Sequence, residues 1–136
     1  MKNIFKSYVE AINNSDLETA MALISNEAKL INSKYRPSVP AEGIELIRTY
    51  ILETVIAQNG RITIIDLQEN DDVVEAKIEL RSDRISRMGL DRILGTERFT
   101  IQNDKIVGFE FSMNLEDAET KQFFDFVRNL EANRPE

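Results

Sequence analysis

Residues 96–111 read TERFTIQNDKIVGFEF, in which two runs of alternating apolar and polar side chains flank Asn103-Asp104. A period of two is typical of strands that bury one face. Asparagine and aspartate tolerate the positive φ that tight hairpin turns need. The stretch therefore predicts an antiparallel hairpin whose inward face carries Phe99, Ile101 and the carboxyl group of Glu97.

A second hairpin is predicted upstream, within residues 62–80. Its first strand is rich in β-branched residues, and an acidic turn separates it from a strand in which apolar and charged residues alternate. Apolar groups fall on both faces of the first strand, with Ile62 and Ile64 on one face and Ile65 and Leu67 on the other. We therefore expect the outer face of the sheet to be covered by a second copy of the chain.

Helical spacing predicts three helices before these hairpins. The first has an apolar stripe that ends near Asn13-Asn14: Ile4, Phe5, Tyr8, Val9 and Ile12. Ser15-Asp16-Leu17-Glu18 has the form of a capping box with Ser15 as the cap, and it predicts a short second helix. Residues 28–31 then predict a brief extended piece, and two prolines make residues 35–40 a loop. The third helix carries Ile44, Ile47, Ile51 and Val55, and Asn59-Gly60 ends it.

Two segments complete the chain. Residues 82–95 lack a clean strand period and predict a loop or a helical turn. From about Glu116 onward helical spacing returns, which predicts a C-terminal helix with one apolar face: Phe123, Phe124, Val127 and Leu130. Helices, then a mostly antiparallel sheet, then a last helix predict an α+β fold in which an open, curved sheet wraps a long helix. We expect residues 1–136 to form one domain.

The composition excludes several classes of function. Seventeen Lys and Arg against twenty-four Asp and Glu give a net charge of −7, which opposes binding to nucleic acid or to an anionic membrane. The chain has no cysteine and no histidine, which excludes disulfides, thiolate nucleophiles, zinc fingers and imidazole bases. Because no signal peptide and no bilayer-spanning apolar stretch is visible, we expect a cytoplasmic protein.

The order of these elements, together with three motifs, resembles the nuclear transport factor 2-like superfamily. Residues 8–20 (YVEAINNSDLETA) and 26–30 (NEAKL) are similar to its ketosteroid isomerase and SnoaL-like branch, and residues 96–107 are similar to the last hairpin of that branch. The resemblance covers roughly residues 3–113 and implies a cystatin-like cone, with a C-terminal helical extension at residues 116–131. That extension either seals the open end of the cone or reaches across a dimer.

The resemblance also implies a site. The isomerases of that branch use a carboxylate base and two acidic donors that stabilise an oxyanion. Tyr8 falls where they carry the oxyanion-hole tyrosine, and Glu97 lies near the second donor. Asn32 stands where they have the catalytic aspartate, and an amide cannot take up a proton. We expect Tyr8, Asn32 and Glu97, with Phe99 and Phe109, to bind the ligand.

Each polar candidate also has a purely structural interpretation. Tyr8 is equally compatible with a core residue whose hydroxyl bonds to the backbone. Glu97 is compatible with a solvated acid or with an ion pair to Arg81. Asn32 fits a simple turn former. Asp66 shares a face with apolar residues of its strand, which makes it a substitute base in principle, but its place near the strand end favours exposure.

A locally basic segment follows the first hairpin and carries Arg81, Arg84, Arg87, Arg92 and Arg98. Arginine forks suit carboxylate or phosphate ligands, whereas the structural interpretation is exposed ion pairs or contact with the acidic C-terminal helix. The sequence shows no glycine-rich phosphate loop and no converging metal ligands, so we expect neither a metal nor a cofactor.

These observations favour a homodimer in which an interior pocket binds a small, mostly apolar molecule without catalysis. The alternative is a cofactor-independent isomerase, cyclase or dehydratase that uses Asp66 or Glu97 as a relocated base. A third hypothesis is a protein-interaction module that uses the outer sheet face or the arginine-rich segment.

Overall fold

The computed structural model describes residues 1–132, with side chains described up to Leu130. Its elements, in chain order, are α1 (Lys2–Asn13), α2 (Leu17–Ala22), β1 (Ile24–Leu30), α3 (Gly43–Thr54), the 3-10 turn η1 (Ile56–Gln58), β2 (Arg61–Asn70), β3 (Val73–Arg81), α4 (Asp83–Arg87), β4 (Ile93–Gln102), β5 (Lys105–Met113) and α5 (Ala118–Ala132).

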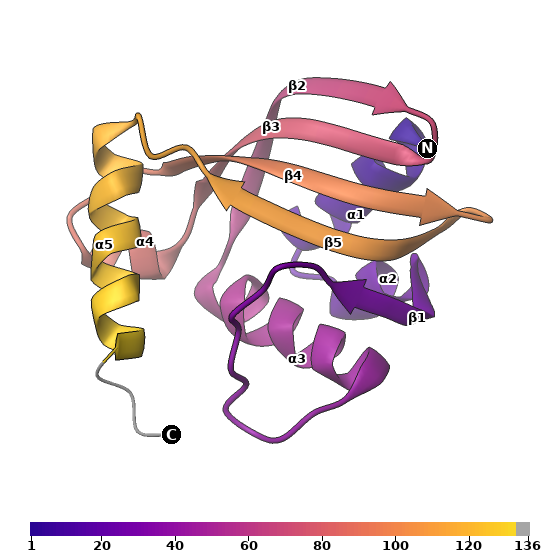
Figure 1. Cartoon of the computed structure of the whole chain (residues 1–136), viewed down its shortest axis with the longest axis horizontal. Coiled ribbons are helices and arrows are strands. Elements are labelled where there is room, and N and C mark those ends of the chain that lie inside the picture. Colours follow the sequence, from indigo (N-terminus) through magenta and orange to yellow (C-terminus); the bar gives the residue numbers. More distant parts are fainter. Residues whose placement is uncertain (133–136) are drawn as a thin grey trace.

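The five strands form one curved sheet in the order β1-β5-β4-β3-β2. Strand β1 runs parallel to β5, and all other neighbours are antiparallel. Helices α1, α2 and α3 pack on the concave side, and α5 stands at one end of the sheet (Figure 1). The predicted α+β cone is confirmed.

Both predicted hairpins are present. Strands β4 and β5 pair through a turn in which Asn103 and Asp104 have φ of 53° and 61°, the positive values expected of these residue types. In the β2–β3 turn Asp71 has φ of 53°. The alternation in β4 holds as well, because Glu97, Phe99 and Ile101 are buried on one face while Arg98 is exposed.

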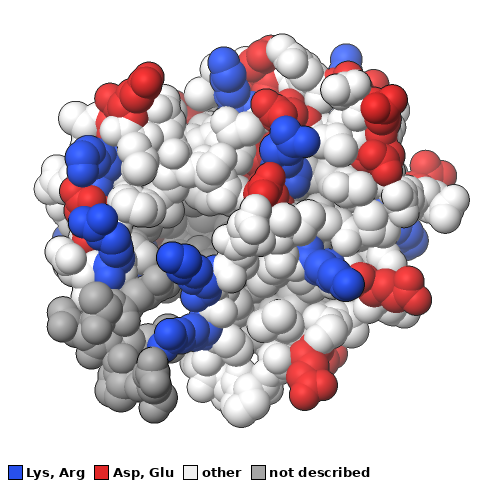
Figure 2. All heavy atoms as spheres, in the orientation of Figure 1, with Lys and Arg blue, Asp and Glu red and all other residues white. Residues whose placement is uncertain are grey.

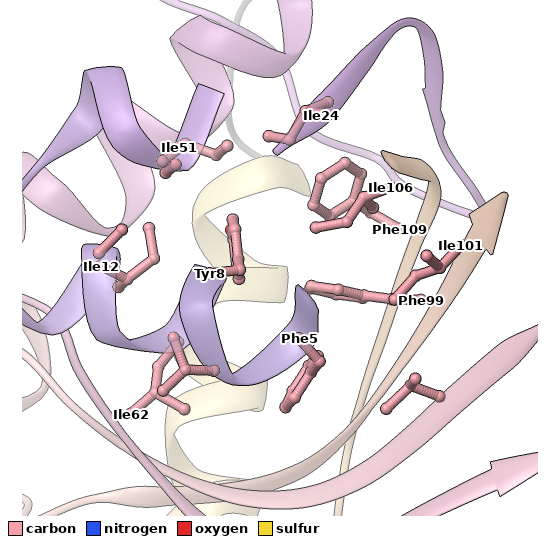
Figure 3. Close-up of a cluster of buried hydrophobic side chains, with 14 of the residues drawn as sticks. Phe5, Tyr8, Ile12, Ile24, Ile51, Ile62, Phe99, Ile101, Ile106 and Phe109 are labelled. Atoms are coloured by element: carbon pink, nitrogen blue, oxygen red, sulfur yellow. The ribbon is translucent and has the colours of Figure 1, made fainter. Parts of the chain in front are cut away.

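The core joins α1 to the β4–β5 hairpin through aromatic rings (Figure 3). Phe5 and Tyr8 of α1 lie 5.1 Å and 5.2 Å from the ring of Phe99, measured between ring centroids. Phe109 of β5 packs 4.8 Å from Phe99 and 5.9 Å from Tyr8. Edge-to-face and tilted contacts of this kind stabilise a core beyond the area they bury.

A bulge in β2 corrects the expectation about the outer sheet face. The register against β3 shifts before Asp66, so Ile65 is an extra residue and is 58% exposed. Ile64 and Leu67, on either side of it, both pack against the core together with Ile62. The prediction of apolar groups on both faces is wrong, and it therefore gives no evidence for a second copy of the chain on the outer face.

The cap of α2 lies one residue later than predicted. Ser15 has φ of 54°, a left-handed conformation that ends α1. Asp16 is the cap, since its carboxylate accepts from the Thr19 backbone N–H at 3.1 Å and from the Thr19 hydroxyl at 2.6 Å. Capping by Asp16 lowers the pKa of its carboxyl, mainly through the hydroxyl hydrogen bond.

Three element boundaries also differ from those predicted. Strand β1 begins at Ile24, four residues before the expected extended piece. Within residues 82–95 the expected helical turn is α4, but β4 already begins at Ile93. The last helix starts at Ala118. No helix in residues 1–132 is long and apolar enough to cross a membrane.

Helix α5 packs on its own chain rather than reaching away from it. Phe123 of α5 joins a second apolar cluster with Ile85, Leu90 and Ile93. Because α4, the β4 start and α5 share this cluster, they form one end wall of the cone. The structure thus resolves where the C-terminal extension lies within a single chain.

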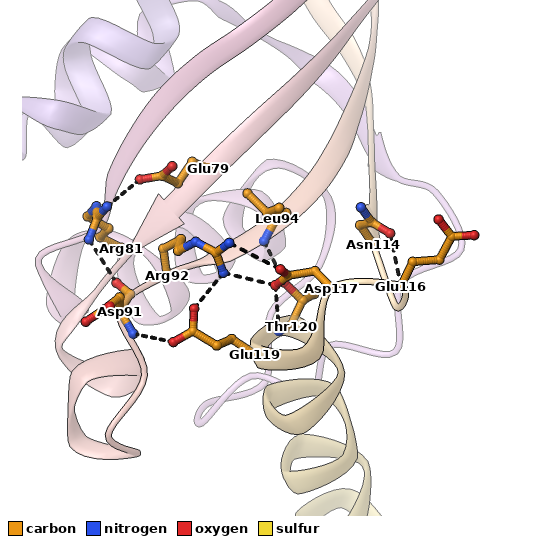
Figure 4. Close-up of polar contacts among 10 residues, drawn as sticks. All are labelled: Glu79, Arg81, Asp91, Arg92, Leu94, Asn114, Glu116, Asp117, Glu119 and Thr120. Carbon is orange, nitrogen blue, oxygen red and sulfur yellow. Dashed lines mark hydrogen bonds and ion pairs between the residues drawn. The ribbon is translucent and has the colours of Figure 1, made fainter.

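A polar network fixes the start of α5 to β4 (Figure 4). The Thr120 hydroxyl, fully buried, accepts from the Leu94 backbone N–H at 2.8 Å and donates to Asp117 at 2.7 Å. Arg92 donates to both carboxylate oxygens of Asp117, at 3.0 Å and 3.2 Å, and to Glu119 at 2.7 Å. Hydrogen bonds from Arg92 and Thr120 lower the pKa of Asp117 to about 2.

We predict that Thr120→Val destabilises the protein, because it leaves the Leu94 N–H without an acceptor in a buried position. The expected loss in free energy of unfolding is roughly 1–3 kcal/mol, measured by urea denaturation. Thr120→Ser keeps the hydroxyl and serves as the control. Equal stability of Thr120→Val and the wild type would show that this network does not hold α5.

Candidate functional site

Three oxygen-bearing side chains approach one another inside the cone. Tyr8 comes from α1, Tyr50 from α3 and Glu97 from β4. Glu97 is only 8% exposed, because its position on the inner face of β4 lies between Ala76 of β3 and Phe111 of β5. The curved sheet thus points a carboxyl group at the tyrosines on two helices.

Burial changes the acidity of all three groups. Loss of water raises the pKa of Glu97 to about 7. Burial, together with the charge of Glu97, raises the pKa of Tyr50 to about 12, and the same two causes, with a smaller contribution from Tyr50, hold the pKa of Tyr8 well above its usual value of 10.0. Near neutral pH both phenols are therefore hydrogen-bond donors, and Glu97 exchanges readily between its acid and carboxylate forms.

None of the hydrogen bonds found for residues 1–132 satisfies these groups. Neither the two phenol hydroxyls nor the Glu97 carboxyl has a protein partner within hydrogen-bond distance, and burial alone accounts for the raised pKa of Glu97. Within the described side chains no nitrogen or oxygen atom is both fully buried and without a partner, so these oxygens keep some accessible surface where a water or a ligand can bind. The phenols can donate hydrogen bonds, and the Glu97 carboxyl can accept or release a proton.

The surroundings of these oxygens are apolar and aromatic. Phe99 and Phe109 are 2% and 4% exposed, and they pack around Tyr8 in the core; their role in binding a ligand stays a prediction. Phe111 lies across Gly95, where an added Cβ would meet its ring at 2.4 Å. The glycine lets the Phe111 ring lie flat over the strand next to Glu97.

Two of the predicted site residues lie elsewhere. Asn32 is exposed after β1, has φ of 54° and donates a hydrogen bond to Glu110 at 2.8 Å. It acts as the turn former that the structural interpretation suggested. Asp66 is exposed beyond the bulge and pairs in register with Lys77, so it is not an interior base. Tyr8, Glu97, Phe99 and Phe109 are brought together.

Tyr50 is a candidate site residue that sequence reasoning missed. Its ring lies 5.2 Å from that of Tyr35 and packs against the core. It is three residues after Ile47 and one before Ile51, both fully buried. The helical spacing from Ile47 placed Tyr50 next to the buried stripe, and that spacing was the available signal.

A hollow of about 410 Å³ opens next to Tyr50, at the end of the cone (Figure 2). The loop after β1, the end of α3, α4 and α5 contribute its lining: Tyr35, Arg36, Glu53, Thr54, Arg84, Val127 and Leu130. Tyr35 lies in this lining and contacts Tyr50 edge to face. A second hollow of about 390 Å³ lies far away, at residues 24–27 and Lys105. Neither hollow is lined by Glu97.

Most of the arginine-rich segment is engaged in structure. Arg81 pairs with Glu79, and Arg98 pairs with Glu75 and Glu110. Arg92 contacts the acidic start of α5, as the structural interpretation predicted. Among residues 1–132 no group of three or more acidic side chains is arranged to hold a metal ion.

Solved structures share this fold at low sequence identity. A nuclear transport factor 2-like protein of unknown function from Cytophaga hutchinsonii has a TM-score of 0.63 and 10% identity, covering 85% of this chain and 90% of its own. A cystatin fold protein from Novosphingobium aromaticivorans has a TM-score of 0.62 and 19% identity, covering 81% and 95%. The epoxide hydrolase/cyclase-like enzyme SalBIII, of pyran ring formation in salinomycin, has a TM-score of 0.67 and 18% identity, covering 85% and 92%.

The architecture and these likenesses define the class: the chain has the cystatin-like cone of the nuclear transport factor 2-like fold. No family model and no curated protein matches its sequence. The equivalence of Asn32 with the catalytic aspartate of the isomerase branch stays a prediction.

We predict that the stability of the protein falls between pH 5 and pH 8 because of Glu97. Its pKa rises from 4.5 when unfolded to about 7 when folded, so the folded state keeps a proton that the unfolded state has lost. Stability is therefore greatest below pH 4.5 as far as this group is concerned, and it declines as pH rises through 7. With about 1.4 kcal/mol for each pKa unit, the full loss is roughly 3 kcal/mol.

Urea denaturation at several pH values tests this dependence. The chain has no histidine to titrate in the same range. Glu97→Gln is expected to remove most of the slope, and Glu110→Gln, on the opposite face of the sheet, is expected to keep it. A wild-type slope retained in Glu97→Gln would contradict the assignment.

Proposed function

We propose that the protein binds a small, mostly apolar molecule in the interior of the cone and that binding requires no catalysis. One oxygen of this molecule, in a carbonyl or hydroxyl group, accepts hydrogen bonds from Tyr8 and Tyr50 and lies beside Glu97. The observation that supports the proposal is that two buried side chains, Tyr8 and Glu97, and the half-buried Tyr50 influence one another's pKa values while no described residue hydrogen-bonds to their oxygens.

The energetic argument is that a ligand oxygen gives these groups a hydrogen-bond partner that no described residue supplies. Each such hydrogen bond contributes about 0.5–1.5 kcal/mol. The aromatic rings of Phe99 and Phe109 supply the apolar contacts that a small-molecule site needs. A ligand of mixed character, apolar with one oxygen, fits this combination.

Entry to the interior is from the hollow at the end of the cone. Tyr35 lines that hollow and contacts Tyr50, and the charge of Glu97 helps to raise the pKa of Tyr50. This series of contacts supports the choice of the hollow as the entrance. The homodimer through the outer sheet face stays a prediction. The bulge at Ile65 removes the apolar pattern that suggested it, so the strand pairing adds no support for a dimer.

A second candidate is catalysis by Glu97. A carboxyl with a pKa of about 7 beside two phenol donors is suited to move a proton next to a carbonyl group. The solved structure of SalBIII is that of a cyclase-like enzyme on this fold. An isomerase, cyclase or dehydratase would therefore use Glu97 as the relocated carboxylate, and Asp66 would take no part.

We predict that neutral ketones and alcohols of eight to fourteen carbons bind more tightly than hydrocarbons of matched shape, by about tenfold. Isothermal titration calorimetry measures this preference. Tyr8→Phe combined with Glu97→Gln is expected to abolish it, because both changes remove partners for the ligand oxygen and leave the apolar wall intact. Glu110→Gln is the matched control and is expected to bind like the wild type.

Equal affinity of the double variant and the wild type would exclude this interior site. Deuterium exchange at the carbon next to the carbonyl of the same ketones separates binding from catalysis. Exchange that rises with pH through about 7 and disappears in Glu97→Gln would select the enzyme; exchange no faster than in buffer selects the binding protein.

A further inference from the structure

Two arginines border the hollow at the end of the cone without an acidic partner in residues 1–132. Arg36 comes from the loop after β1 and Arg84 from α4, and neither takes part in an ion pair or a hydrogen bond there. The Arg84 guanidinium lies 5.6 Å from the centre of the Phe123 ring, which positions it without neutralising its charge. Arg36 is exposed and Arg84 is half-buried, so both guanidinium groups are accessible to a ligand in the hollow.

The acid in the same lining is already occupied. Glu53 accepts hydrogen bonds from the Tyr35 hydroxyl and from the backbone N–H and hydroxyl of Ser38. These donors fix the loop after β1 to α3, and they leave the Glu53 carboxylate no role as a partner of Arg84. The other arginines of that segment contrast with Arg84, since Arg81, Arg92 and Arg98 each pair with a carboxylate and Arg87 donates a hydrogen bond to Gln58.

The remaining walls of the hollow suit the body of a ligand. Val127 and Leu130 of α5 present aliphatic surface to it, and Leu130 is 49% exposed in this structure. On the inner side the ring of Tyr35 leads to Tyr50 and, behind it, to Glu97. The arginines and the apolar walls thus border one hollow, and contacts through Tyr35 and Tyr50 lead from its lining toward Glu97.

We propose that Arg36 and Arg84 bind the carboxylate of an amphiphilic acid whose apolar chain extends past Tyr50 into the interior. This inference rests on the proposed function and names its ligand class: a carboxylic acid with an oxygen function distant from the acid group. Guanidinium forks bind carboxylates with charge-assisted hydrogen bonds, and the half-enclosed hollow limits screening by solvent. Binding of this head group explains why the two cations are left unpaired.

The test uses ω-hydroxy acids of eight, ten and twelve carbons, their methyl esters, and the parent acids without the hydroxyl group. Affinities are measured by isothermal titration calorimetry at pH 7.5 and low ionic strength. The wild type is expected to bind the acid about tenfold more tightly than the ester, and Arg36→Gln combined with Arg84→Gln is expected to remove this preference. Arg81→Gln with Arg98→Gln makes the same change in net charge elsewhere and is expected to keep it.

The outcomes separate this inference from the function it rests on. Equal binding of acid and ester, with a preference for the hydroxyl group that needs Tyr8 and Glu97, overturns the carboxylate site and leaves the interior site standing. A preference for the acid that needs Arg36 and Arg84, with no effect of the hydroxyl group, supports the carboxylate site and overturns the interior one. If the Arg81 and Arg98 control also loses the acid preference, that preference depends only on the net charge of the protein, and the carboxylate site is overturned. No binding of any of these acids overturns both.

Discussion

Aromatic packing between α1 and the β4–β5 hairpin constrains the rest of the interior. Phe5 and Tyr8 leave the same face of α1, being three residues apart, and Phe99 and Phe109 lie opposite each other in register. Their rings meet at centroid distances between 4.8 Å and 5.9 Å. A one-residue slip of β4 would turn Phe99 outward, and Glu97 with it. The packing that holds the cone together therefore also keeps the Glu97 carboxyl next to the phenol of Tyr8.

Two buried polar side chains, Glu97 and Thr120, differ in whether protein groups hydrogen-bond to them. The Thr120 hydroxyl both accepts and donates a hydrogen bond, so the network around it is complete and contributes to stability. The Glu97 carboxyl has no such partner, and burial raises its pKa to about 7. In the proposed function, the bound molecule supplies the partner that the described residues do not give to Glu97.

Local sequence patterns predicted the sheet, the inward register of Glu97 and the position of Tyr8, because each of these depends on spacing within one strand or helix. The bulge at Ile65 could not be predicted, since it exists only in the pairing of β2 with β3. Asn32 was misplaced because the resemblance equated sequence position with site position, while its left-handed conformation turns the chain outside the interior. Tyr50 was missed because its role depends on how α3 crosses the sheet.

The last helix connects the fold to the mouth of the cone. Phe123, Val127 and Leu130 lie three or four residues apart, so they form one stripe along α5. The stripe begins in the second apolar cluster and continues into the lining of the hollow, where Leu130 remains half exposed. The network of Arg92, Asp117 and Thr120 fixes the start of the helix and thereby the direction of this stripe. In the proposed site, an apolar molecule held at the mouth would bury the part of the stripe that the described residues leave exposed, and the end wall of the cone would then contribute to binding.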